Sequence, residues 1–177
     1  AGIHQINGNI IIDNTRFSSP DYPMGWAWES NAWYYQAPVT SIILNENKVP
    51  ITLTSSEKLG EKTAVALAFN EEPLIKLHSN VVTVTQAESA AHCQIEVQMN
   101  ESNDLSLKGC WPQQEKPVTL NVALKNPLLL AEKTIRDALK AEKIVLTGKI
   151  ITGQADPNLK TIASHASKPL KTLLAKV

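Results

Sequence analysis

Short apolar segments separated by polar turns occupy the first two thirds of the chain. Branched apolar residues dominate these segments, and turn-forming residues recur about every ten residues, as in small all-β units. Because Asn45–Lys48 is a turn sequence, we expect Val39–Leu44 and Val49–Thr54 to pair as a hairpin. The other predicted strands are Ile6–Asp13, Thr63–Phe69, Val81–Thr85, Cys93–Met99, Leu105–Leu107 and Val118–Leu124.

The pattern changes to helical spacing after residue 126. Asn126 is a good N-cap and Pro127 suits the first helical position. Apolar residues then recur three and four positions apart: Leu128, Ala131, Ile135, Ala138 and Leu139. A strand over Ile144–Ile151 and a final amphipathic helix over Leu170–Val177 are expected to follow.

This order of elements predicts a mixed α+β fold. An α/β unit, with helices near 127–142 and 167–177, is interrupted by a small all-β insert. We therefore expect a discontinuous α/β subdomain, residues 1–45 with 117–177, around a nested all-β subdomain, residues 46–116. Because strand-like residues begin almost at once and the last helix stops in mid-pattern, we expect this sequence to be part of a longer or processed chain.

Composition excludes several classes of protein. The 177 residues carry 17 basic and 17 acidic side chains, and no Lys/Arg cluster exceeds a pair, so nucleic acid is not an expected partner. No apolar run approaches the roughly 18 residues of a membrane span, and none resembles a signal peptide. The chain is therefore expected to be a globular protein with no transmembrane segment.

The two cysteines, Cys93 and Cys110, flank a turn-like segment at 100–104. A disulfide between them would staple one hairpin and stabilise the fold by about 3 kcal/mol through loop closure. Such a bond predicts a periplasmic or extracellular location. The alternative is a pair of buried thiols in a cytosolic protein.

An aromatic cluster lies between residues 26 and 35. One interpretation is a corner of the core or a seam between domains, and the other is a flat face on which a glycan or peptide stacks. The residues predicted to contact a ligand or an interface are Trp26, Trp28, Trp33, Tyr34 and Tyr35.

Five segments, in order, resemble the non-catalytic insert of the penicillin-binding protein 4 type D-alanyl-D-alanine carboxypeptidases/endopeptidases. These are GIHQINGNIIID at the start, GWAW with Ala-Pro and Asn-x-Asn after it, LKGC before Pro112, Asn126-Pro127 with its helix, and SKPL at 167–170. The resemblance implies a periplasmic serine hydrolase that cleaves terminal D-Ala or cross-links in cell-wall peptides. Its acyl-enzyme would also form with β-lactams. The expected partners of this region are the parent catalytic domain and peptidoglycan peptides.

The catalytic motifs of that family are not expected in this region. Ser-x-Asn and Lys-Thr-Gly do not occur, and only Ser55-Ser56-Glu57-Lys58 has Ser-x-x-Lys spacing. The chemistry requires this serine at the start of a buried helix, whereas the four residues lie in a polar turn. We therefore predict no catalytic residue and an inactive region within an active parent.

No cofactor or metal site is predicted either. The four histidines, His4, His78, His92 and His165, are scattered, without the spacing of metal ligands. Two other functions remain open: a free-standing extracellular glycan- or peptide-binding module that uses the tryptophans, and a subunit-interface module that uses Leu170, Leu173 and Leu174.

Overall fold

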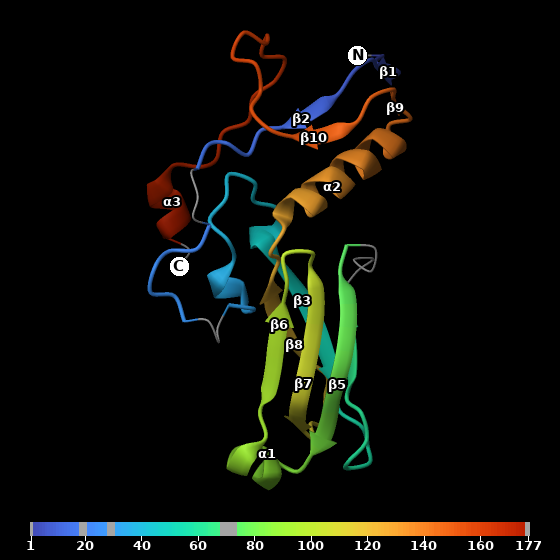
Figure 1. Ribbon diagram of the computed structural model, residues 1–177, viewed down its shortest axis with the longest axis vertical. Helices are drawn as coiled ribbons and strands as arrows, with labels where there is room; N and C mark the ends of the chain where they lie inside the picture. Colours follow the sequence, from blue (N-terminus) through green and yellow to red (C-terminus); the bar gives the residue numbers. More distant parts are fainter. Residues whose placement is uncertain (1, 18–20, 28–30, 68–73, 176–177) are drawn as a thin grey trace.

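The structure is a computed structural model that describes residues 2–17, 21–27, 31–67 and 74–175. Two three-stranded sheets form one end of the molecule, and two short parallel strand pairs form the other (Figure 1). The long helix α2 (Pro127–Ala141) lies between these two parts. The predicted mixed α+β class is confirmed.

The first three-stranded sheet, called here the β3 sheet, is antiparallel. Its central strand β3 (Lys48–Thr54) pairs with β4 (Ala64–Leu67) on one side and with β8 (Val118–Ala123) on the other. The side chains of β3 alternate between buried and partly exposed, which is the pattern of a strand with one face on the core.

The predicted strand Val39–Leu44, and its hairpin with residues 49–54, are wrong. Ile42 and Leu44 instead pack against an apolar cluster at α2, so their side chains are half-buried without a strand ladder. The Asn47 side chain also holds this segment, because it accepts a hydrogen bond from the Leu44 N–H (3.1 Å) and donates one to the Ile42 carbonyl (3.0 Å). Asn45–Asn47 forms a single 3-10 turn, as does Tyr34–Gln36.

The second three-stranded sheet, called here the β7 sheet, has the order β5–β7–β6. Strand β7 (Asp104–Pro112) pairs parallel to β5 (Lys76–Val84) and antiparallel to β6 (Ile95–Met99). A helix that we did not predict, α1 (Gln86–His92), connects β5 to β6 at the far end of the sheet (Figure 1). Its capping box is the signal in the sequence: the Thr85 side chain accepts from Glu88 N–H, and the Glu88 carboxylate accepts from Thr85 N–H.

The two sheets face each other across the main core. Buried side chains from β3 and β8 meet buried side chains from β5, β6 and β7 in one cluster. This is the arrangement of a small β-sandwich, in which alternate residues of both sheets fill the space between them. The central members are Ile51, Leu53, Val81, Leu105, Leu107 and Val122.

At the other end, segments about 140 residues apart in the sequence lie side by side. Strand β1 (Gln5–Ile6) pairs parallel to β9 (Val145–Leu146), and β2 (Ile10–Ile12) pairs parallel to β10 (Ile150–Thr152). Each predicted strand, 6–13 and 144–151, is therefore divided in two.

Two glycines explain this division. Gly8 has a φ of +122°, which interrupts the extended backbone between β1 and β2. Across from it, a Cβ added to Gly148 would collide with the Gly8 carbonyl, so only glycine permits this approach. Polar side chains connect the two segments between the strand pairs. For example, the Asn9 side chain accepts a hydrogen bond from the Lys149 N–H (2.9 Å).

Helix α2 covers one face of these parallel pairs. Its Ala131 packs with Ile12 of β2 and Ile150 of β10 in a second apolar cluster. Asn126 caps the helix by accepting from the Leu129 N–H (3.4 Å), as its sequence predicts. The last helix, α3, is shorter than predicted and extends over Leu170–Leu174, while residues 176 and 177 lie outside the described residues.

Candidate functional site

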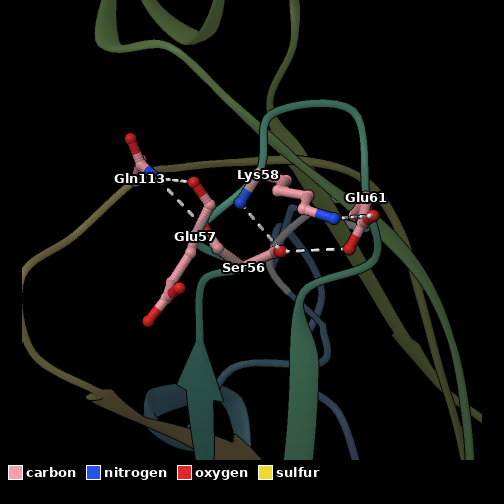
Figure 2. Close-up of polar contacts among 5 residues, drawn as sticks. All are labelled: Ser56, Glu57, Lys58, Glu61 and Gln113. Carbon is pink, nitrogen blue, oxygen red and sulfur yellow. Dashed lines mark hydrogen bonds and ion pairs between the residues drawn. The ribbon is translucent and has the colours of Figure 1, made fainter.

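The Ser55–Lys58 segment lies in an exposed loop between β3 and β4. The Ser55 hydroxyl donates to the Gln114 carbonyl (3.1 Å) and accepts from the Gln114 N–H (2.8 Å). In Figure 2, the Lys58 side chain extends toward Glu61, whose carboxylate lies 4.0 Å from the Lys58 ammonium. Serine and lysine therefore bind different partners, and this geometry does not activate a nucleophile.

The rest of this loop is a hydrogen-bonded turn. Figure 2 shows Gln113 donating to the backbone carbonyls of Ser56 and Glu57, both at 3.0 Å. The Ser56 hydroxyl accepts from the Lys58 N–H (3.1 Å) and contacts Glu61 (3.4 Å). These contacts join the β3–β4 loop to the segment after β7, and their role is structural.

Cys93 and Cys110 form a disulfide, as predicted. Cys93 ends α1 and Cys110 lies in β7, so the bond attaches the helix to the central strand of its sheet. Over the residues that the structure describes, no group of three His, Cys, Asp or Glu side chains is placed to hold a metal ion. The described helices are also all too short or too polar to cross a membrane.

The described residues of the predicted aromatic cluster have different surroundings. Trp26 is 38% exposed and packs edge-on against Tyr22, with ring centroids 6.4 Å apart. Trp33 is instead half-buried, packs against the main core and forms a β-bridge with Val122 of β8. Tyr34 and Tyr35 form an exposed edge-to-face pair, and Trp28 lies outside the described residues.

Trp26 lines a cavity of about 690 Å³, called here the Trp26 cavity. The loop that carries Tyr22 and Trp26 forms one wall, and the β7 sheet forms the other. His78, Ser106 and Gln98 lie in register across that sheet, from β5 to β7 to β6, and all of them line the cavity. At the end of the sheet the lining continues with Met99, Asn100, Glu101 and Asp104.

A buried lysine holds the loop against the sheets. Lys125 follows β8 and is only 5% exposed. Its ammonium donates to the backbone carbonyl and to the side-chain oxygen of Asn31, and it lies 4.5 Å from the centroid of the Tyr22 ring. This cation–π contact and the two hydrogen bonds fix the loop next to Trp26.

Burial changes the acidity of both partners. It lowers the pKa of Lys125 to about 8, although the Glu101 carboxylate nearby opposes the shift. Burial also raises the pKa of the Tyr22 phenol well above its ordinary value, and Glu101 and Asp21 add to this effect. At neutral pH Lys125 is therefore a cation and Tyr22 a neutral phenol.

We expect the stability of the protein to rise between about pH 8 and pH 10, because the unfolded chain, with an ordinary lysine pKa of about 10.4, then binds more protons than the folded chain. Above about pH 10, the raised pKa of Tyr22 acts in the opposite direction, because only the unfolded chain then loses that proton. Urea unfolding at several pH values should show the rise in the native protein and a smaller one in Lys125→Met. Identical pH profiles for the two proteins would contradict this assignment.

The sequence offered little signal for several of these residues. Lys125 ends the apolar run Val122–Leu124 without an acidic neighbour to suggest a pair. Gln98, Ser106 and Asp104 read as the ordinary polar side of two strands, and only the register of β6 and β7 brings them together. Trp26 was identified from the density of aromatic residues around it.

The comparisons with known proteins agree on one family. The D-Ala-D-Ala carboxypeptidase 3 (S13) family matches residues 1–177. The D-alanyl-D-alanine carboxypeptidase DacB of Haemophilus influenzae is 30% identical over 176 residues, which are 99% of this chain and 36% of that protein.

Two solved structures are also similar. The crystal structure of penicillin binding protein 4 (dacB) from Haemophilus influenzae superposes with a TM-score of 0.85 at 29% identity, over 99% of this chain and 38% of that one. The structure of penicillin binding protein 4 (dacB) from the same organism, complexed with a novel β-lactam, gives a TM-score of 0.66 at 26% identity, over 77% and 31%. The chain thus spans little more than a third of the relatives that it matches.

Proposed function

The chain belongs to the D-Ala-D-Ala carboxypeptidase 3 (S13) family, and from this membership we propose that it is the accessory, non-catalytic insert of a serine D-alanyl-D-alanine carboxypeptidase/endopeptidase. The parent enzyme acts in the periplasm on peptidoglycan peptides, cleaving them through an acyl-serine intermediate. The insert itself contributes no reacting group.

The observation that carries the proposal is the extent of the match. Nearly all of this chain aligns with little more than a third of the relatives, so most of the parent lies elsewhere. The chain also lacks Ser-x-Asn and Lys-Thr-Gly, and its single Ser-x-x-Lys segment lies in the loop between β3 and β4. The absence of these motifs supports a role beside the catalytic domain and outside its chemistry.

The parallel strand pairs offer a surface on which the rest of the parent can pack. Ile11 of β2 and Ile151 of β10 are register partners, and they are 40% and 38% exposed. Their neighbours Ile12 and Ile150 pack against α2, so in these alternating strands Ile11 and Ile151 point away from that helix. Covering such an apolar pair with the catalytic domain would stabilise both parts.

We also propose the two-part division expected from the sequence, with residues 1–45 and 117–177 as the α/β subdomain and 46–116 as the nested subdomain. The separation of the sandwich from the parallel strand pairs supports it (Figure 1). Because β8 begins at Val118 and pairs with β3 in the sandwich, the nested subdomain would end after β8 and not at residue 116.

A fluorescent penicillin tests the proposed role directly. We expect no covalent labelling of the 177-residue chain, because the Ser55 hydroxyl is hydrogen-bonded to the backbone of Gln114 and not to a lysine. The full-length protein that contains the chain should be labelled under the same conditions. Gel fluorescence with mass spectrometry provides the readout, and labelling of the isolated chain at Ser55 would refute the proposal.

A further inference from the structure

The Trp26 cavity combines an aromatic wall with a polar wall. The aromatic residues Trp26 and Tyr22 line one side, and His78, Ser106 and Gln98 line the other with an imidazole, a hydroxyl and an amide. Together these groups can donate and accept hydrogen bonds at closely spaced points. In the part of the chain that the structure describes, the side chains of His78 and Ser106 have no hydrogen-bond partner.

Two buried polar atoms of the lining also lack hydrogen-bond partners. The Tyr22 hydroxyl and Asp104 Oδ1 are buried and make no hydrogen bond with any described residue, although Asp104 Oδ1 lies 3.9 Å from the Lys76 ammonium. Leaving a buried hydroxyl such as that of Tyr22 unsatisfied costs about 1–3 kcal/mol, so native proteins rarely retain one without a reason. One of these atoms can donate and both can accept, which matches a ligand that carries hydroxyl groups.

The charges around the cavity are balanced. The Asp104 carboxylate lies 3.9 Å from the Lys76 ammonium, and the Glu101 carboxylate acts on the buried Lys125 cation. An excess of positive charge would favour an anion, and unopposed carboxylates would favour an amine. Here neither sign dominates, so the cavity suits an uncharged ligand.

We propose that the Trp26 cavity binds a neutral saccharide unit. A pyranose ring has one apolar face, which stacks on an aromatic side chain, and a rim of hydroxyl groups, which bind amide, hydroxyl and carboxylate groups. The cavity volume of about 690 Å³ lies within the ordinary range of about 300–1,000 Å³ for ligand sites. That the natural saccharide is the glycan strand of the cell wall rests on the function proposed above.

The test uses the full-length protein that contains this chain, with its active-site serine first acylated by benzylpenicillin. Tri-N-acetylchitotriose is then titrated and the heat of binding is measured. Trp26→Ala should lower the affinity about tenfold, which corresponds to about 1.4 kcal/mol of lost stacking. Gln98→Ala should lower it about two- to tenfold, as expected for one lost hydrogen bond.

Phe17→Ala is the matched control, because Phe17 is an exposed aromatic residue that does not line the cavity. Its affinity should equal that of the native protein. Thermal unfolding of each variant shows whether it is folded. If Trp26→Ala does not fold, Gln98→Ala still tests the proposal, because Gln98 is an exposed residue of β6.

The proposal would be overturned by no binding of the sugar, by unchanged affinity in folded Trp26→Ala and Gln98→Ala, or by an equal loss in Phe17→Ala. Binding of a sugar-free stem peptide with the same dependence on Trp26 would also overturn it, since the occupant would then be a peptide. If benzylpenicillin does not acylate the full-length protein, the function proposed for the parent enzyme is contradicted. The saccharide proposal remains testable in that case, because sugar binding can still be measured.

Discussion

Replacing Leu105 with alanine is expected to lower the free energy of unfolding by about 2–5 kcal/mol. Leu105 is fully buried in β7, the central strand of its sheet, and lies between Leu77 of β5 and Met99 of β6 in the register. Strands on both sides fix the backbone here, so the sheet cannot close over the space that the shorter side chain leaves. Urea unfolding, followed by circular dichroism, measures the change.

Leu59→Ala provides the control for this experiment, because it deletes the same atoms from a residue that is 50% exposed. Its effect should stay within about 0.5 kcal/mol, as for most surface substitutions. Similar losses in both variants would show that Leu105 does not lie in a closely packed core.

Replacing Gly109 with alanine should be nearly as damaging, with a loss of about 3 kcal/mol. Gly109 has a φ of +88°, and an added Cβ would collide with the Gln94 carbonyl, which belongs to the backbone. The unfavourable φ costs about 1–2 kcal/mol, and the steric overlap adds about 1–3 kcal/mol. Chemical unfolding of the oxidised protein gives the magnitude.

Gly60→Ala separates the two contributions to that loss. Gly60 also has a positive φ, +82°, but an added Cβ there meets no atom within 4 Å. Only the backbone cost of about 1–2 kcal/mol should remain. If the two variants lose the same stability, the contact between Gly109 and Gln94 is not the cause.

Local periodicity predicted most of the elements and missed most of the pairing. Apolar alternation located β3, β4, β6 and β8, and the Asn126-Pro127 cap located α2. The same pattern failed at Val39–Leu44, where Ile42 and Leu44 pack half-buried against the cluster at α2 and hydrogen-bond to the Asn47 side chain, without a strand partner. A run of apolar residues indicates that side chains are buried, but it does not indicate which backbone groups pair with one another.

The register of strands far apart in the sequence was beyond single-sequence reasoning. Strand β5 aligns parallel with β7, and β1 and β2 align parallel with β9 and β10. These alignments depend on the path of the chain between the paired strands, which local sequence patterns do not specify. The family resemblance, in contrast, is confirmed, because it rested on several motifs whose order spans the chain.

The candidate site was only partly predictable for the same reason. Aromatic density singled out Trp26, but the sequence did not distinguish it from Trp33, which packs against the core. The loop that carries Trp26 is attached through Asn31 to Lys125, which is distant in the sequence. The disulfide was predictable because the chain has only two cysteines.

The pairing of residues 5–12 with residues 145–152 has one further consequence. The chain leaves these paired strands and returns to them at nearly the same place, so residues 13–144 form an insertion between two adjacent strands. Lengthening or shortening this insertion would leave the pairing of β1 and β2 with β9 and β10 unchanged. We therefore expect whole modules at this position to be exchangeable during evolution while these strand pairs are retained.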